Sequence, residues 1–413
     1  MPKNTSETAG QGPRKSGWIG PGLLISASFI GPGTVTTATA TGASFGFALT
    51  WAVVFSIVAT IILQEMSVRL GLTARLSTGE ALRKTFENPV AKVAMTALVI
   101  AAIGIGGAAY AGGDTTGTAL ALSAVTGLPV PALAGIIAAV IILLLLSGSY
   151  KVLEKVMTVL VMLLAAVFLV TVVAVKPDFA ELLRGTFMPS IPDGAALKAI
   201  ALIGTTVVPY NIFLHSNLVR EKWGDEEPDL ALKKGRVDNA VSITVGGLIT
   251  LAILSTAAAV MFTQGLEAES AADLAEPLRP TLGQFAPWAL AIGLFAAGLT
   301  SAIAGPLGAA YAITGLLGWS SDLKDPKFRA IFLTVVVVGA IIAITGANPI
   351  EIIILAQAAN GLLLPIIAFF LLITMNNKRV LGEHANGLVA NILGGAVFLI
   401  TLALGGITLY GLL

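Results

Sequence analysis

The chain has 413 residues, of which 56% are hydrophobic and only 11% charged, and its mean hydropathy is +0.91. Soluble domains are nearer to about 25% charged, so part of the solvent around this chain must be lipid. The 24 Lys and Arg residues nearly balance the 23 Asp and Glu residues, and a net charge of +1 creates no overall field to attract nucleic acid. The composition therefore excludes a cytosolic enzyme, a nucleic-acid binder and a secreted scaffold.

The scarcity of metal-binding and nucleophilic side chains narrows the function further. Cysteine is absent, which excludes disulfides, thiolate metal sites and a cysteine nucleophile. The two histidines, His215 and His384, are too few for a histidine-rich metal site. No phosphate-binding loop of the form GxxxxGK[ST] occurs, so we expect no ATP-driven pump, no chemical catalysis and no cofactor.

A polar segment at 1–17 precedes the apolar part of the chain. The apolar stretch after it has no obvious cleavage site, so we predict a cytoplasmic tail and not a signal peptide. Eleven stretches are long and apolar enough to cross a bilayer. We place them at 18–45, 48–70, 93–122, 130–148, 153–175, 196–219, 238–262, 285–317, 329–346, 350–375 and 385–412. The sequence thus predicts an all-α membrane protein with one transmembrane domain over 18–413.

The basic residues give an independent check on these spans. With the N-terminus in the cytoplasm, 20 of the 24 Lys and Arg residues fall in or beside cytoplasmic segments, as the positive-inside rule requires. Only Lys176, Arg184, Lys198 and Arg279 fall on the other side. We therefore expect the N-terminus inside and the C-terminus outside, in the plasma membrane of a prokaryote.

Two of the spans are interrupted at their centres. The first contains Gly31-Pro32-Gly33-Thr34 and the sixth contains Val208-Pro209-Tyr210-Asn211. Proline removes a backbone donor, and unwound backbone at membrane depth is tolerated where it lines a cavity. Because the first repeat would contain five spans, an odd number, the second set enters from the opposite side, which predicts inverted repeats at about 18–175 and 196–375 and an extra helix at 385–412. Matching breaks in inverted halves are typical of transporters with a midplane site; the alternative is two unrelated proline kinks.

Polar side chains within the spans are candidates for the site. Asp114 is a carboxylate deep in the third span, either a proton carrier or a structural acid bonded to Thr115 and Thr118. His215 lies one turn after Asn211 and either shuttles protons or stays neutral and buried.

Two further sets of polar residues within the spans each have two possible roles. Gln357 and Asn360 in the tenth span either coordinate a solute or tie helices together. Thr34, Thr37 and Thr41 share one helical face, where their hydroxyls either line a water path or bond back to their own helix.

Several segments carry a resemblance to one family. They are Gln64–Gly71 with Thr78-Gly79, Asp114–Ala119, Lys151–Glu154 and Asn211–Ser216, together with Asp238 and Gln357. The segment 211–216 is the most specific, because it looks like the Asn-x-x-Leu-His-Ser signature of the sixth span in the Nramp metal-ion transporters. The chain resembles this family over nearly its whole length. The resemblance implies a LeuT-type 5+5 inverted repeat with unwound helices 1 and 6, and transport by alternating access.

The substrate site departs from the family pattern. The Nramp motifs are Asp-Pro-Gly-Asn in the first span and Met-Pro-His-Asn in the sixth. Here Gly31 stands in place of Asp, Thr34 of Asn, Val208 of Met and Tyr210 of His. A thioether selects soft transition metals, and a carboxylate offsets the cost of dehydrating a dication. We therefore expect a neutral cage with weak or absent Mn²⁺ and Fe²⁺ transport.

The residues expected at this site fall into three groups. The substrate-binding residues are Gly31, Thr34, Thr205, Val208, Tyr210, Asn211, Gln357 and Asn360. If a metal ion binds there, its expected ligands are Thr34, Asn211 and Gln357, helped by backbone carbonyls. The proton-pathway candidates are Asp114, His215 and Arg329, the last as partner of an acid near the ninth span.

The leading hypothesis is a monomeric secondary transporter related to divalent metal carriers, with a substrate site altered away from transition metals. A larger or hydrated cation fits the expected cage better than Mn²⁺ or Fe²⁺ does. One alternative is a transporter of a small neutral or zwitterionic solute. Another is a non-transporting sensor, similar to the Nramp-like membrane part of the plant ethylene-signalling protein, and a third is a channel.

Overall fold

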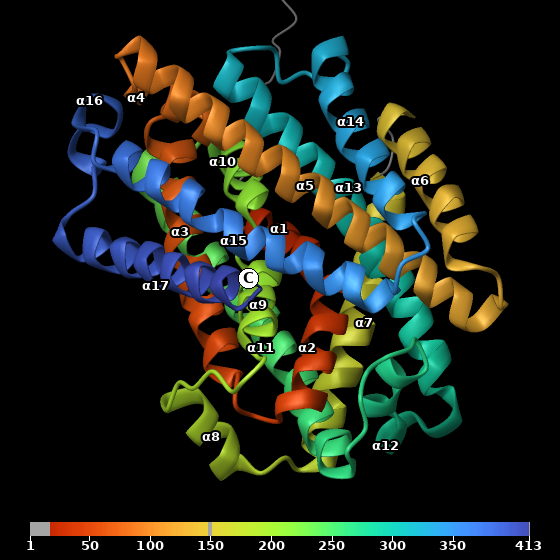
Figure 1. Ribbon diagram of the computed structural model, residues 1–413. Helices are drawn as coiled ribbons and strands as arrows, with labels where there is room; N and C mark the ends of the chain where they lie inside the picture. Colours follow the sequence, from red (N-terminus) through yellow and green to blue (C-terminus); the bar gives the residue numbers. More distant parts are fainter. Residues whose placement is uncertain (1–16, 148–150, 413) are drawn as a thin grey trace, which may run out of the picture.

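The computed structural model describes residues 17–147 and 151–412, and within these ranges the chain forms helices and no strand. Figure 1 shows long, tilted helices gathered in one bundle, with short helices at its two ends. The predicted tail lies outside the described residues, except for Gly17. The all-α membrane class that the composition predicts is confirmed.

The predicted spans correspond to helices of the described ranges. Nine helical runs there are long and apolar enough to cross a membrane, and one of them is the continuous run Ala196–Trp223. Two bent pairs, Pro21–Phe29 with Pro32–Phe45 and Val159–Val175 with Phe179–Phe187, bring the number to eleven if each pair is one span. The long helices are α1 (Pro21–Phe29) with α2 (Pro32–Phe45), α3 (Thr50–Thr73), α5 (Pro89–Thr126), α6 (Val130–Ser147), α7 (Lys151–Val175), α9 (Ala196–Thr206) with α10 (Pro209–Trp223), α11 (Pro228–Val260), α13 (Ala286–Leu317), α14 (Pro326–Ala343), α15 (Pro349–Met375) and α17 (Leu388–Leu412).

Short helices occupy the connections. They are α4 (Thr78–Thr85), α8 (Phe179–Phe187), α12 (Arg279–Leu282) and α16 (Lys378–Leu381). The largest boundary difference is at the seventh span, which was expected from residue 238 and begins at Pro228. Glu227 caps that start by accepting the N–H groups of Asp229 and Leu230, so the helix extends well beyond its apolar part.

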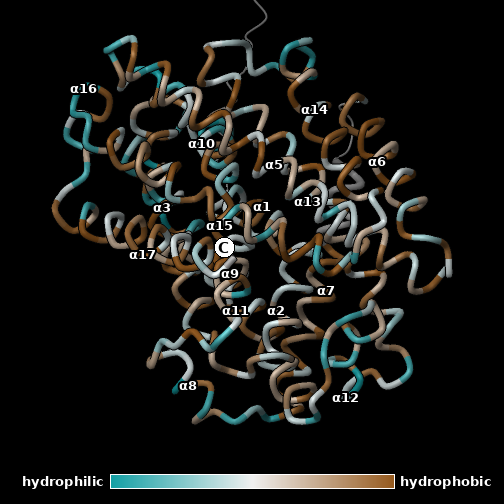
Figure 2. Tube along the Cα trace, viewed as in Figure 1, coloured by the Kyte–Doolittle hydropathy of each residue, from teal (hydrophilic) through white to brown (hydrophobic). Residues whose placement is uncertain are grey.

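Helices at the centre and at the rim of the bundle differ in burial. In the α9–α10 and α13 runs, 89% of the most apolar stretch is buried inside the protein, against 33% in α6, α14 and α17. Figure 2 shows hydrophobic colour along α6 and α17, and hydrophilic colour around α8, α12 and α16 at the ends of the bundle. The rim helices therefore face lipid, and the central ones are shielded from it.

Proline positions explain where many of the helices start. Seven helices begin with proline, at Pro21, Pro32, Pro89, Pro209, Pro228, Pro326 and Pro349. At the first position of a helix the missing N–H has no intrahelical partner to lose, so proline is tolerated there. Proline also drives the residue before it out of the helical region, which ends any helix that approaches from the other side.

Both predicted breaks are confirmed. In the first span α1 ends at Phe29 and α2 starts at Pro32, and the two helices are bent by 54°. Gly31, before that proline, is extended, with φ −112° and ψ −172°. In the sixth span Val208 is likewise extended before Pro209, with φ −85° and ψ 117°. The spans are therefore unwound because each contains a proline at its centre.

A buried carboxylate anchors the start of α1. Asp238 of α11 accepts the N–H of Gly20 at 2.9 Å and the N–H of Gly22 at 2.6 Å, and its side chain is fully buried. Lys222 of α10 donates to the Ile19 carbonyl at 2.5 Å. The two bonds to Asp238 supply an acceptor for N–H groups that the start of a helix leaves free, and all three bonds hold the half-helix α1 against α10 and α11.

Helix α4 is fixed by a capping box. The Ser77 side chain accepts the N–H of Glu80, and the Glu80 carboxylate accepts the N–H of Ser77. Arg220 of α10 also bonds this carboxylate, at 3.1 Å. Burial raises the pKa of Glu80, but the bonds from Ser77 and the Arg220 charge outweigh it, so the net pKa lies below its usual value.

This lowered pKa predicts a pH-dependent contribution to stability. Because the folded pKa of Glu80 is depressed, its stabilising contribution is complete above the ordinary value of 4.5 and is lost as the pH falls through the folded value. We expect the difference in thermal unfolding midpoint between the native chain and Glu80→Gln to be present at pH 7 and to shrink below pH 4.5. An unfolding difference that stays constant across this range would contradict the assignment.

Candidate functional site

The two breaks lie against each other at the centre of the bundle. The Thr34 hydroxyl donates to the Phe29 carbonyl at the end of α1 and lies 2.7 Å from the Thr205 hydroxyl of α9. Because the Thr34 proton points to Phe29, Thr205 is the donor in the second bond. The structure thus joins two predicted substrate residues, and it commits the Thr34 hydroxyl to holding the break.

Asp114 reaches this point from α5. A Cβ built on Gly31 lies 3.2 Å from Asp114 Oδ1 and 3.3 Å from the Ser301 side chain. This approach depends on Gly117, one turn further along α5, where a Cβ would overlap Pro32. The expected cage did not include a carboxyl group, and the structure places the one of Asp114, from the third span, beside the first break.

The Asp114 carboxylate lies beside the Ser301 hydroxyl but has no ion pair and no hydrogen bond of ordinary geometry in the described part of the chain. Its side chain is fully buried, neither oxygen accepts a hydrogen bond, and no ion pair involves it. Thr118 donates to the backbone carbonyl of Asp114 and not to its carboxylate, so this alternative for Asp114 as a structural acid is not supported. A buried carboxylate of this kind is costly unless a cation or a proton accompanies it.

Serine hydroxyls link α13, α1 and α10 around the breaks. Ser301 of α13 donates to the Ser28 carbonyl at 2.7 Å, and the Ser28 hydroxyl lies 3.1 Å from Asn211 Oδ1. Asn211 Nδ2 has no partner in the described residues. Asn211 is therefore held in place by its oxygen, and its amide nitrogen remains available as a donor.

Two tyrosines form one wall of the site. Tyr210 and Tyr110 pack edge to face, with ring centroids 5.4 Å apart and ring planes at 84°. Both side chains are buried, and neither hydroxyl has a hydrogen-bond partner among the described residues. A Cβ built on Gly305 of α13 lies 3.4 Å from the Tyr210 hydroxyl, so this glycine leaves room for the phenol.

The two predicted amides, Gln357 and Asn360, both lie on α15, where one contacts α2 and the other contacts α5. Gln357 packs on Gly33, where a Cβ would overlap its amide nitrogen, and Asn360 lies against Gly106 of α5. All four amide heteroatoms are buried without partners in the described part of the structure. The helix-tying alternative for these residues is therefore not supported, and Gln357 is the one beside the break.

The other threonines on α2 do not bond back to their helix. Thr37 and Thr41 are buried, and neither hydroxyl has a partner within the described ranges. Val208 is the extended residue before Pro209 and is buried with its apolar side chain. The break in the sixth span can therefore contribute backbone groups and the Asn211 amide to a substrate site, and position 208 contributes no sulfur.

The proton-pathway candidates do not converge. Nδ1 of His215 lies 2.9 Å from Gln64 Oε1, and its Nε2 is buried without a partner in the described residues. Arg329 lies in the first turn of α14, where its Nε donates to the Leu323 carbonyl. No ion pair of Arg329 with an acid is found in the part of the chain that the structure describes, so the expected partnership is not supported.

Sequence reasoning missed two residues of this site. Tyr110 lies four residues before Asp114, so helical periodicity alone places it on the same face of α5. Ser301 belongs to no motif, and only its polarity within a buried span could have marked it.

Comparison with known proteins gives the family and the fold of the chain. The family model described as "natural resistance-associated macrophage protein-like", Nramp, matches residues 22–411. The chain belongs to the Nramp family. A divalent metal cation transporter MntH of Yersinia pestis (strain Pestoides F) is 30% identical over 399 residues, covering 96% of this chain and 95% of that protein. A transporter of the same name from Caldanaerobacter subterraneus is 29% identical over 397 residues, covering 95% and 92%.

Solved structures show the same fold. The manganese transporter of Eremococcus coleocola is similar with a TM-score of 0.74 at 19% identity, covering 95% of this chain and 85% of that chain. MhsT, solved in complex with L-phenylalanine, has a TM-score of 0.60 at 16% identity, covering 94% and 98%. The Nramp chain therefore has the LeuT-type inverted-repeat fold that the resemblance implies.

The Nramp motif and this site differ in where the carboxylate comes from. The motif places it on the first break, where this chain has Gly31. Here Asp114 brings the carboxylate from α5 to within contact of the same place. The site thus keeps one carboxyl group and hard oxygen and nitrogen groups, while the sulfur of the family motif is replaced by the apolar side chain of Val208.

Proposed function

We propose that this Nramp protein is a secondary transporter of a divalent cation that keeps part of its hydration shell, with Mg²⁺ as the preferred ion. The observation that carries the proposal is the buried Asp114 carboxylate beside Gly31, which has no partner in the described residues. A cation bound between the two breaks supplies the missing positive charge. The family of the chain and the names of its relatives support a metal ion as substrate.

The ligand chemistry favours a hard ion. Mg²⁺ binds oxygen, loses water reluctantly and is usually held by one or two carboxylates while it keeps several waters. One carboxylate, Asp114, matches that requirement. Soft thioether sulfur, which favours transition metals, is replaced at Val208. We therefore infer that Mn²⁺ and Fe²⁺ lose the advantage that the family motif gives them.

The uncommitted polar groups suit bound water. The hydroxyls of Tyr110 and Tyr210, the amide nitrogen of Asn211 and the Gln357 amide are all buried without partners in the described structure. Water molecules around a cation donate and accept hydrogen bonds, so these groups could hold a hydrated ion through its shell. Asp114 is proposed to bind the ion directly. The two hydroxyls and the two amides are proposed to bind the water molecules around it.

Transport requires alternating access. Asp114, Asn211 and Gln357 are at most 1% exposed, so the site is closed to both ends of the bundle in this structure. The half-helices α1 and α10 meet at the breaks and can tilt relative to the rest of their spans, which opens one end at a time.

We propose that a proton gradient does not drive this transport. A group that binds the cation cannot carry a proton in the same step, and Asp114 is assigned to the cation. His215, one turn after Asn211, is a second candidate proton carrier, and its Nδ1 is engaged by Gln64. The expected driving forces are the cation gradient and the membrane potential.

Uptake into liposomes tests the proposed function. The purified full chain is reconstituted, and uptake of Mg²⁺, Mn²⁺, Ca²⁺ and an amino acid is measured with and without an inward proton gradient. We expect saturable Mg²⁺ uptake that is at least as efficient as Mn²⁺ uptake and is unchanged by the gradient. Protein-free liposomes provide the background.

Other outcomes distinguish the alternatives. A clear preference for Mn²⁺ contradicts the altered specificity. Saturable uptake of the amino acid without cation uptake favours the zwitterionic solute, whose ammonium group would satisfy Asp114. Uptake that does not saturate indicates a channel, and absence of all uptake with a correctly folded protein favours the sensor.

A further inference from the structure

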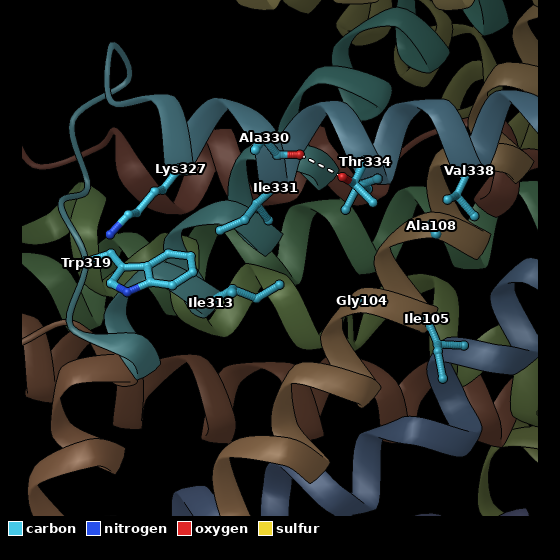
Figure 3. Close-up of a pocket in the computed structure, with 11 residues that line it drawn as sticks. Gly104, Ile105, Ala108, Ile313, Trp319, Lys327, Ala330, Ile331, Thr334 and Val338 are labelled. Carbon is cyan, nitrogen blue, oxygen red and sulfur yellow. Dashed lines mark hydrogen bonds between the residues drawn. The ribbon is translucent and has the colours of Figure 1, made fainter. Parts of the chain in front are cut away.

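A groove at the rim of the bundle is lined by none of the residues described around the breaks. It lies between α5, α13 and α14 and has a volume of about 520 Å³. Figure 3 shows Ile105 of α5, Ile313 of α13 and Ile331 and Val338 of α14 around it. Ile105 and Val338 are 60% and 40% exposed, so the apolar walls are open to the membrane.

One end of the groove is cationic and aromatic. Lys327, in the first turn of α14, places its Nζ 4.9 Å from the centre of the Trp319 ring, as Figure 3 shows. Lys327 is the charged residue of the lining. The nearby carboxylates Asp322 and Asp325 accept the backbone N–H groups of Lys324 and Lys327, and no ion pair with Lys327 occurs in the described ranges.

The length of the groove is close to the thickness of the hydrocarbon layer of one leaflet. Lys327 and Val338 are separated by 11 residues of helix, which corresponds to a groove about 16 Å long. Half of the hydrocarbon core of a bilayer is about 15 Å thick. Trp319 and Lys327 lie where α13 ends and α14 begins, the position that tryptophan and snorkelling lysine take at a membrane boundary.

Small residues create the hollow. A Cβ built on Gly104 of α5 meets no atom within 4 Å, and Ala108 lies one turn further along the same face. Larger side chains at these positions would fill the space. The groove is therefore a consequence of the sequence of α5 at 104 and 108.

We propose that this groove binds an anionic phospholipid, with an acyl chain along α5 and α14 and the headgroup phosphate on Lys327. Charge complementarity selects the headgroup, since the lining carries one positive charge and no negative one. The same end of α14 belongs to a segment that the positive-inside rule assigns to the cytoplasmic leaflet, where anionic lipids attract basic side chains. The site does not depend on the identity of the transported substrate.

Native mass spectrometry of the full chain tests this site. Protein purified in micelles is supplied with 1-palmitoyl-2-oleoyl phosphatidylglycerol or with the matching phosphatidylcholine, and retained lipids are counted. We expect the native chain to retain phosphatidylglycerol preferentially and Lys327→Gln to retain about fivefold less. Lys84→Gln, which removes an exposed charge from α4 outside the groove, should behave as the native chain does.

Variants that fill the groove provide the second arm. Gly104→Leu should lose the retained lipid, and Ala330→Leu on the facing helix gives the same test if Gly104→Leu does not fold. Equal retention of phosphatidylglycerol by the native chain and Lys327→Gln, or by both filling variants, overturns the proposal. So does displacement of the lipid by an equal concentration of glycerol 1-phosphate, because free phosphate would then be the ligand.

Discussion

Replacing Asp114 by Asn is expected to abolish saturable Mg²⁺ uptake while making the cation-free protein more stable. The Asp114 carboxylate would pair with the bound cation, and removing one partner of a buried ion pair costs about 3 kcal/mol or more, roughly a hundredfold in affinity. Without the cation the same carboxylate is buried and has no ion-pair partner. The neutral amide therefore removes the free-energy cost of burying a charged group. Uptake in liposomes and thermal unfolding in Mg²⁺-free detergent solution measure the two effects.

Asp238→Asn is the matched control for this experiment. Asp238 is also fully buried, but it accepts the N–H groups of Gly20 and Gly22, so its charge is satisfied by the protein itself. The amide loses one of these acceptor contacts and should lower the unfolding midpoint. A destabilised Asp114→Asn, or one that transports Mg²⁺ as the native chain does, contradicts the assignment of Asp114 as the cation ligand.

The second large effect is expected from moving the carboxylate back to the first break. Gly31→Asp alone should impair transport, because its Cβ lies 3.2 Å from Asp114 Oδ1 and two adjacent carboxylates repel each other. Combining it with Asp114→Gly and Val208→Met leaves one carboxylate and adds a thioether. This triple variant should favour Mn²⁺ over Mg²⁺ by about tenfold more than the native chain does.

Competition uptake, with Mn²⁺ and Mg²⁺ present together, measures that change. Val208→Met alone is the control for the sulfur. It adds the thioether while the carboxylate stays at Asp114, and it should produce part of the shift in selectivity. Thr34 is left unchanged, because its hydroxyl bonds the Phe29 carbonyl and the Thr205 hydroxyl and so supports the break itself. Unchanged selectivity in the triple variant would show that the groups at 31 and 208 do not determine the preferred ion.

The fold was predictable because its determinants are local. Apolar length places the spans, and Pro32 and Pro209 place the breaks, since each proline stops the helix before it. The start of the seventh span was less predictable. The cap at Glu227 lets α11 begin in a charged segment that has no apolar signal.

The site was only partly predictable because its key contact joins distant segments. The sequence shows that Gly31 lacks a carboxylate and, separately, that Asp114 is a deep acid. It does not show that Gly117 lets α5 approach Pro32 closely enough to bring the two together. Ser301 and Tyr110 were missed for the same reason, since their roles arise from packing between helices and not from a local pattern.

The anchoring of α1 by Asp238 has a consequence for the resting state of the protein. If α1 swings away from α11, two main-chain donors lose their acceptor, and the enclosed Asp238 carboxylate keeps only the bond from the Ser242 hydroxyl of its own helix among the described residues until solvent enters. That penalty arises at the end of the bundle where Lys222 lies, and nothing equivalent links α2 to α11 among the hydrogen bonds of the described residues. The empty carrier should accordingly spend most of its time shut at that end, and its return step, rather than ion capture, should limit the turnover rate.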